Sequence, residues 1–157
     1  MAGRHKQTCS LAGFLNVFGD AWSLMIVREA IYGTTRFSEF QRNTGAARNL
    51  LSERLTTLVN HGILKKVNIA SKGERYAYEL TEKGRSLQPL LAGIILWSNE
   101  HLYREDSAPN RVIDTTTGDE LHGITLTHTP TQMPHDIRVV AGPGASSAAR
   151  KRLAEIY

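Results

Sequence analysis

Hydrogen-bonding side chains gather on one side of the segment 44–64, whose sequence is TGAARNLLSERLTTLVNHGIL. At about 100° per helical residue, Asn49, Ser52 and Thr56 fall within about 100° of Arg48. Base edges in a DNA major groove suit these groups, because Arg pairs with guanine, Asn with adenine, and a hydroxyl with either. The candidate base contacts are therefore Arg48, Asn49, Ser52 and Thr56.

The same segment carries an apolar stripe on its other side. On the same angular scale Leu51, Leu55 and Leu58 fall at about 280–340°, which predicts a helix held in a core by its leucines. The polar side has two interpretations, because most core-packed helices also have a face that is only solvated. Glu53 lies on that side and could accept from cytosine or repel phosphates. For Arg54, at about 240°, we expect an ion pair within the domain or a phosphate contact.

A basic β-hairpin is predicted directly after this helix. ILKKVNIA and RYAYELT are short β-like runs, and the SKGE between them suits a tight turn. Lysine and arginine side chains on such a hairpin bind phosphates, which fix the position of a protein on DNA. Arg36, which precedes the short helix predicted from about Ser38, could bind a phosphate in the same way. The candidate phosphate contacts are therefore Arg36, Lys65, Lys66, Lys72 and Arg75.

The order of the predicted elements is typical of a winged helix-turn-helix. Apolar residues recur at helical spacing before the hairpin and again after it, and Gly, Asp, Ser and Thr mark the ends of the segments. The predicted fold class is mainly α with a small β-hairpin wing. The elements are helices over 10–18 and 21–32, a short helix from about Ser38, a helix over 47–61, a hairpin over 64–81 and a long helix over 81–103.

The chain beyond residue 103 has a different composition, rich in Thr, Pro, His and Gly. We predict two parts: a DNA-binding and dimerisation domain over 1–103, and a short β-rich C-terminal appendage over 104–157. The appendage carries strand-like runs and a terminal helix capped by Ser146 or Ser147. The predicted strands are 111–117, 122–127 and 136–141.

Positive charge is concentrated in the first two-thirds of the chain. The 157 residues carry a net charge of +4, but residues 1–103 hold 13 Lys/Arg against 8 Asp/Glu, and the remainder holds 6 against 7. This distribution favours a polyanionic partner such as double-stranded DNA, although mildly basic domains without such a partner are common. No apolar run approaches the roughly 20 residues of a membrane span, and no signal-peptide pattern opens the chain, so we expect a cytoplasmic protein with no membrane partner.

Other chemistries have little support in the sequence. A single cysteine excludes an intrachain disulfide framework and a Cys-rich zinc site. His122, His128 and His135 lack the spacing of helical metal ligands. No acid–base pair or activated nucleophile has a supporting arrangement. We therefore predict no metal, no cofactor and no enzyme activity.

The predicted helix over 81–103 has a wider apolar stripe than one small domain needs. Such a stripe predicts packing against its own domain on one side and against a second subunit on the other. The candidate dimer-interface residues on this helix are Leu87, Leu91, Ile94, Ile95 and Leu102.

Several motifs along residues 9–103 match a known family in order and spacing. They are GDAWSLMIVREAIYG at 19–33, RFSEFQRNTG at 36–45, LLSERLTTLVNHGIL at 50–64 and YELTEKGRSLQPLL from residue 78, with Cys9 and Trp97 at matching places. In these segments the chain resembles the HxlR-type regulators of the MarR-like winged-helix group. The resemblance implies a bacterial, homodimeric, DNA-binding transcription regulator whose first and last helices form the dimer. It therefore adds Leu11 and Leu15 of the first helix to the candidate dimer interface. The chain departs from the family at Ala47, where a Ser or Thr cap is common, at a cost of about 1 kcal/mol.

Cys9 matches a position at which several relatives of this family carry a redox-sensing thiol. A helix N-terminus and the neighbouring Arg4, His5 and Lys6 would lower the pKa of this thiol. Oxidation would give an adduct or a disulfide between subunits. The alternative is that Cys9 packs as a small apolar residue in a dimer helix.

The predicted function is a sequence-specific regulator of transcription that binds double-stranded DNA. A homodimer would bind a pseudo-palindromic operator, under the control of Cys9 oxidation or a small ligand. The alternative is a winged-helix protein-interaction module whose basic face meets an acidic partner. Sequence-selective binding to genomic DNA fragments distinguishes the two.

Overall fold

A computed structural model describes residues 5–6, 8–70, 73, 75–104, 106–123 and 137–156. The chain forms two compact units, Met1–Ser86 and Leu87–Tyr157, which are described separately. We predicted a boundary after residue 103, whereas the contacts within the chain group residues 87–103 with the C-terminal strands.

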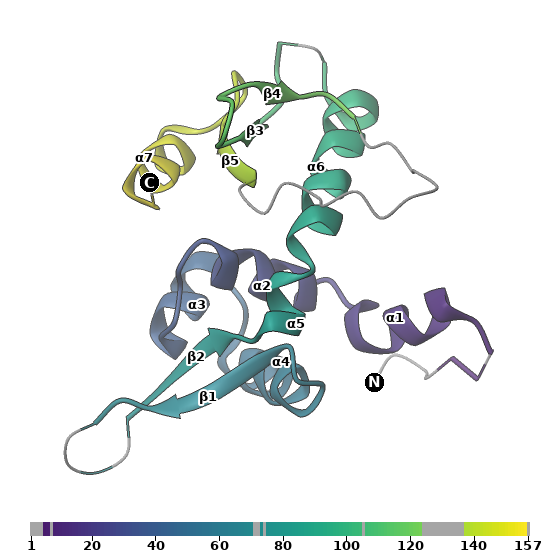
Figure 1. The fold of residues 1–157 in the computed structure, drawn as a ribbon. Coiled ribbons are helices and arrows are strands. Elements are labelled where there is room, and N and C mark those ends of the chain that lie inside the picture. The colour runs from purple at the N-terminus through teal and green to yellow at the C-terminus, as the bar shows by residue number, and fades with distance from the viewer. Residues whose placement is uncertain are drawn as a thin grey trace. The chain divides into compact units, whose positions relative to one another are not determined.

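Four helices build most of the N-terminal unit (Figure 1). Asp20 starts the second of them, because its carboxylate accepts hydrogen bonds from the backbone N–H groups of Trp22 and Ser23. Gly45 ends the third in the left-handed conformation, at φ 73°, which turns the chain toward the fourth. The helices are α1 (Ser10–Phe18), α2 (Ser23–Ile31), α3 (Phe37–Thr44) and α4 (Arg48–Asn60).

The core of this unit lies where α2, α3 and α4 meet. Ile26, Phe40, Leu51 and Leu55 are fully buried there. The leucine stripe predicted for α4 is confirmed, since Leu58 is also fully buried. Burial of this stripe fixes which side of α4 faces outward.

The predicted hairpin is present as β1 (Leu64–Asn68) and β2 (Tyr76–Leu80). The strands are antiparallel, with Leu64 opposite Leu80 and Asn68 opposite Tyr76. The hairpin extends from the helical part of the unit (Figure 1). Its base is fastened by the Thr81 hydroxyl, which donates to the carbonyl of Gly62 at 2.6 Å.

The single helix predicted over 81–103 is wrong, because the structure has two helices there. Thr81 caps the four-residue α5 (Glu82–Arg85), and α6 (Gln88–Leu102) begins with Pro89 in its first turn. Gly84 is buried so close to β1 that a Cβ would stand 2.2 Å from the Ile63 carbonyl oxygen. This packing ties α5 to the hairpin, and Pro89, which has no N–H, starts a new helix.

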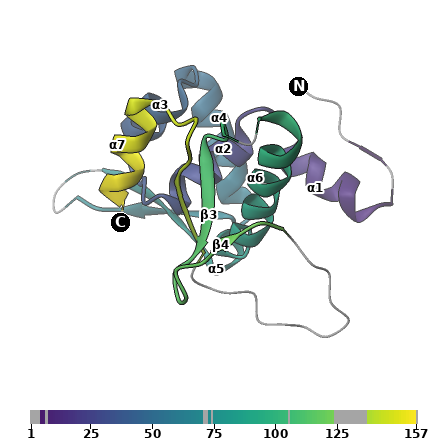
Figure 2. The same cartoon turned by 90° about the horizontal axis from the view of Figure 1, so that it is seen from above.

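The C-terminal unit is a three-stranded antiparallel sheet between two helices. The strand order is β4 (Glu120–Leu121), β3 (Asn110–Asp114) and β5 (Ile137–Ala141). Helices α6 and α7 (Ser147–Ile156) lie on opposite sides of the sheet (Figures 1 and 2). Val112, Ala92 and Ile137 form the buried centre between α6 and the strands.

The predicted fold class, mainly α with a hairpin wing and a short β-rich C-terminal part, is confirmed. The predicted strand over 122–127 lies mostly outside the described residues, as do His128 and His135. Within the described part of the chain, no single helix has the length and apolar composition of a membrane span; α1 and α2 meet that criterion only as a pair bent by 79°.

Candidate nucleic-acid interface

The outward side of α4 carries the four predicted base contacts. All four side chains are exposed, in contrast to the fully buried leucines on the other side of the helix: Arg48, Asn49, Ser52 and Thr56. The Thr56 hydroxyl donates to the Ser52 carbonyl at 2.9 Å. Its proton is therefore engaged, and the Thr56 oxygen faces solvent as an acceptor.

Arg48 is held at the start of α4 by an aromatic ring from α3. Its guanidinium carbon lies 5.6 Å from the centroid of the Phe37 ring, within the range of a cation–π contact. Stacking of this kind leaves the N–H groups at the edge of the guanidinium able to donate. The contact joins the two helices of the helix-turn-helix at their exposed edge.

Arg54 serves an ion pair within the unit, one of the two roles expected for it. Its guanidinium lies 3.7 Å from the Asp20 carboxylate and 3.5 Å from Glu53, and its side chain is only 20% exposed. Burial raises the pKa of Asp20, but hydrogen bonds from Ser23 and Trp22 and the charge of Arg54 outweigh it and lower the pKa below its ordinary value. Arg54 therefore anchors α4 to the turn before α2.

The N-terminus of α4 has no side-chain cap. Ala47 occupies the cap position and offers no oxygen to the first-turn N–H groups. Thr44 stabilises the preceding turn instead, where its hydroxyl oxygen accepts from the Ala46 N–H at 3.3 Å. The uncapped N–H groups and the helix dipole make this end suitable for a phosphate.

The basic side chains of the hairpin differ in whether a neighbouring side chain already contacts their charged group. Lys65 is paired with Glu79 directly across the strands, at 2.9 Å. Lys66 lies with its ammonium 3.8 Å from the centroid of the Tyr76 ring. Arg75 is exposed, and Lys72 lies outside the described residues.

Arg36 precedes α3, where its backbone N–H donates to Glu39 at 3.2 Å. This bond begins α3 at Phe37, one residue before the predicted Ser38. The Arg36 side chain is half-buried. Its role as a phosphate contact, like those of the hairpin residues, stays a prediction.

A buried polar network that sequence reasoning missed connects α2 to α3. Glu29 is fully buried, and its carboxylate accepts from Arg28 at 2.6 Å and from the Thr34 hydroxyl at 3.5 Å. Asn43 of α3 donates to the same Thr34 oxygen at 3.2 Å. Adjacent Arg and Glu residues in a sequence usually indicate surface, so no local pattern pointed to this network.

Cys9 is exposed and stands at the N-cap of α1. The backbone N–H groups of Ala12 and Leu11 lower the pKa of its thiol, because they stabilise the thiolate. Of its predicted basic neighbours, His5 and Lys6 are exposed and Arg4 lies outside the described residues.

The predicted dimer residues fall into two groups by exposure. Leu11 and Leu102 are more than 60% exposed, and Leu15 and Ile94 are about 40% exposed. The others are half-buried: Leu87, Leu91 and Ile95. Ile95 also packs on the core of its own unit. Their role in a dimer stays a prediction.

Comparison with known proteins relates this geometry to a family. The family model for an HxlR-like helix-turn-helix matches residues 17–106. The Mycobacterium tuberculosis protein Rv3095, an uncharacterized HTH-type transcriptional regulator, is 37% identical over 110 residues, which is 70% of each chain.

Two solved structures extend the similarity. PA1607, described as a candidate transcription factor, is 36% identical with a TM-score of 0.58 over 92% of this chain and 93% of its own. The redox regulator HypR, in its reduced form, is 27% identical with a TM-score of 0.55 over 60% of this chain and 96% of its own. The chain belongs to the HxlR-like helix-turn-helix family of transcriptional regulators.

Proposed function

We propose that this regulator binds double-stranded DNA sequence-specifically, through α4 in the major groove and the hairpin over 64–81 on the phosphates. The observation that carries the proposal is the division of α4 into two sides. Leucines bury one side completely, while the side chains of Arg48, Asn49 and Ser52 stand exposed on the other. A helix presented in this way fits the major groove, where the donor and acceptor pattern differs for each base pair.

The regulator acts as a homodimer in this proposal. Each of the helices α1 and α6 exposes apolar side chains that a second copy could cover, and a twofold dimer binds a pseudo-palindromic operator. The expected location is the cytoplasm, where DNA is accessible. Sedimentation of the purified chain with and without operator DNA measures the stoichiometry.

Oxidation of Cys9 is the proposed control of DNA binding, with a small ligand as the other candidate. The exposed thiol, its lowered pKa and the similarity to the redox regulator HypR support the thiol. Non-reducing gels and DNA titrations of wild type and Cys9→Ser after mild oxidation test it. The absence of both a Cys9-dependent crosslink and a Cys9-dependent change in affinity would exclude redox control.

The decisive experiment compares two asparagines of the same helix. Operator fragments are first selected from genomic DNA, and then binding of Asn49→Ala and Asn60→Ala is measured by fluorescence anisotropy. Loss of a bidentate base contact costs about 1–3 kcal/mol, so Asn49→Ala should weaken operator binding about 5-fold to 150-fold and binding to random DNA far less.

Asn60 is exposed at the last turn of α4, and its replacement controls for loss of an amide from this helix. Equal losses on operator and random DNA for Asn49→Ala would mean that α4 makes no base contacts. If no genomic fragment is bound selectively, the basic face serves an acidic protein partner instead.

A further inference from the structure

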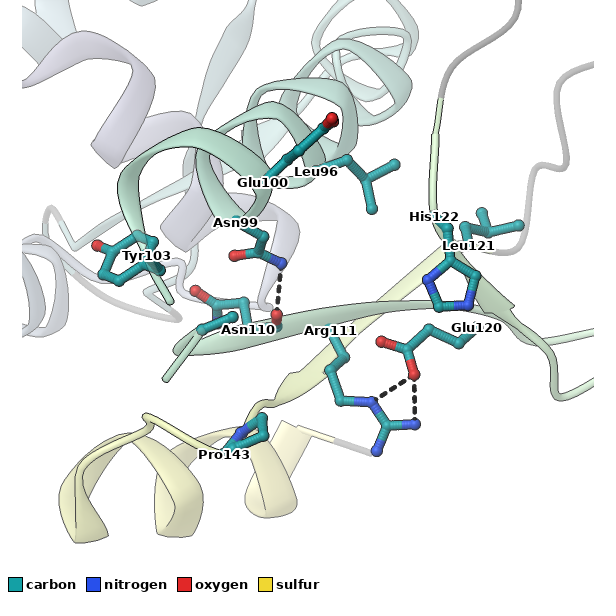
Figure 3. Close-up of a pocket in the computed structure, with 11 residues that line it drawn as sticks. Leu96, Asn99, Glu100, Tyr103, Asn110, Arg111, Glu120, Leu121, His122 and Pro143 are labelled. Atoms are coloured by element: carbon teal, nitrogen blue, oxygen red, sulfur yellow. Dashed lines mark hydrogen bonds and ion pairs between the residues drawn. The ribbon is translucent and has the colours of Figure 1, made fainter. Parts of the chain in front are cut away.

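The C-terminal unit contains a pocket between α6 and the β3–β4 edge of its sheet (Figure 3). Its volume of about 680 Å³ is in the range of pockets that enclose drug-sized organic molecules. All of its lining residues belong to this one unit. The pocket is therefore formed without any contribution from the DNA-binding face.

Apolar and aromatic side chains form part of the lining. Leu96 of α6 and Leu121 of β4 pack against the buried cluster around Val112, which fixes their positions. Tyr103, directly after α6, adds an aromatic ring that is 46% exposed. Asn99 donates to the Asn110 carbonyl at 2.7 Å and so joins α6 to β3 beside the pocket (Figure 3).

The charged side chains of the pocket favour one sign of ligand. The Arg111 guanidinium donates twice to one oxygen of Glu120, at 2.8 and 2.7 Å (Figure 3). Because this pair is already matched, the guanidinium is not available to an incoming anion without loss of these bonds.

Glu100 adds a second carboxylate, 72% exposed and 3.8 Å from the His101 ring nitrogen. The carboxylate and guanidinium side chains of the lining number two and one, so together they are net negative within a chain of net charge +4. Because Arg111 and Glu120 balance each other, Glu100 is the uncompensated charge, and a net negative lining favours a cationic ligand over an anionic one.

We propose that this pocket binds an amphipathic organic cation. The apolar or aromatic surface of this ligand packs on Leu96, Leu121 and the Tyr103 ring. The positive charge of the ligand faces the Glu100 and Glu120 carboxylates. An aromatic ring and carboxylates attract a large, weakly hydrated cation more than a small hydrated one. An organic anion of the same shape meets two carboxylates and an arginine that is already bonded.

A pair of ions with the same shape and opposite charge tests the proposal. Tetraphenylphosphonium and tetraphenylborate are titrated into the full chain, without DNA, by isothermal calorimetry. We expect saturable one-to-one binding of tetraphenylphosphonium, at least about ten-fold tighter than any binding of tetraphenylborate. Equal affinity for both ions, or no saturable binding of the cation, would overturn the proposal.

Three glutamate variants locate the site. Glu120→Gln and Glu100→Gln should each weaken tetraphenylphosphonium binding about five-fold, whereas Glu155→Gln on the exposed side of α7 should leave it unchanged. Since Glu100 is exposed, its variant tests the site even if Glu120→Gln disturbs the sheet. Equal losses in all three variants would show a general charge effect and overturn the assignment. Cation binding is expected whether or not the chain binds an operator, so the two proposals fail separately.

Discussion

The guanidinium of Arg48, at the start of α4, lies over the ring of Phe37, at the start of α3, with 5.6 Å between the guanidinium carbon and the ring centroid. This contact spans the turn of the helix-turn-helix and restricts a long side chain that would otherwise move freely. A side chain held in place before binding loses less conformational entropy when it meets a base. Phe37 is thus a positioning residue for the proposed base contact.

Replacement of Phe37 by Leu should weaken operator binding by about two-fold to five-fold, because an exposed cation–π contact is worth about 0.5–1 kcal/mol. Anisotropy titrations with operator and random DNA measure the change. Phe37→Tyr keeps the ring and should bind like the wild type. If the Leu variant binds the operator as tightly as the Tyr variant, the ring does not position Arg48.

Removal of the carboxylate opposite Lys65 should strengthen DNA binding. Glu79 holds the Lys65 ammonium at 2.9 Å, so Glu79→Gln frees this cation for a phosphate. We expect an affinity gain of about 1.4-fold to five-fold on operator and random DNA alike, since an exposed pair is worth about 0.2–1 kcal/mol. The salt dependence should steepen, because one more phosphate is neutralised.

Glu82→Gln removes the same charge from α5, away from Lys65, and serves as the matched control. An equal gain in this variant would attribute the effect to net charge alone. A gain confined to Glu79→Gln supports the cross-strand pair as a restraint on Lys65.

Glu29→Gln should lower the free energy of unfolding by about 1–3 kcal/mol. The carboxylate is fully buried and binds Arg28 and Thr34, so the neutral amide leaves the half-buried guanidinium with a weaker partner. Urea denaturation followed by circular dichroism measures the change. Glu53→Gln, at an exposed position on α4, should change stability far less; equal effects would argue against a structural role for the buried network.

The Cys9 thiol should ionise at a lower pH in the folded chain than in the unfolded chain. Hydrogen bonds from the Ala12 and Leu11 N–H groups lower its pKa, so the reactive thiolate is already populated at a lower pH. The rate of alkylation by iodoacetamide from pH 5 to 10 measures the midpoint. Because Cys9 is the single cysteine, the same chain unfolded in urea is the control, and identical midpoints would contradict the effect of the helix N-terminus.

Much of the N-terminal unit could be predicted from local patterns. The spacing of Leu51, Leu55 and Leu58 determines which side of α4 is buried, because a helix has a fixed angular period. Gly45 marks the turn before α4 by its left-handed conformation, and the two predicted β-like runs pair as an antiparallel hairpin. Three candidate base contacts, Asn49, Ser52 and Thr56, follow from the same period, since they fall roughly opposite the leucines, while Arg48 lies at the edge of that side.

Other features depend on residues that are distant in the sequence. Arg54 was placed beside the core by its helical angle, but only the fold brings it to Asp20, 34 positions away. The break at 86–87 was not predicted from the apolar spacing: Gly84 packs α5 against the Ile63 carbonyl, and Pro89 begins α6. The pocket was also not predicted, since Glu100 and Glu120, 20 positions apart, line one cavity only after β4 pairs with β3.

The sequence by itself determined the four N-terminal helices, the hairpin and the polar side of α4, because each depends on the period and turn chemistry of neighbouring residues. The tertiary structure decided the burial of Glu29, the pairing of Lys65 with Glu79 and the charged lining of the C-terminal pocket. Those features depend on distances across the fold, and a side chain's charge and exposure are set by what packs against it.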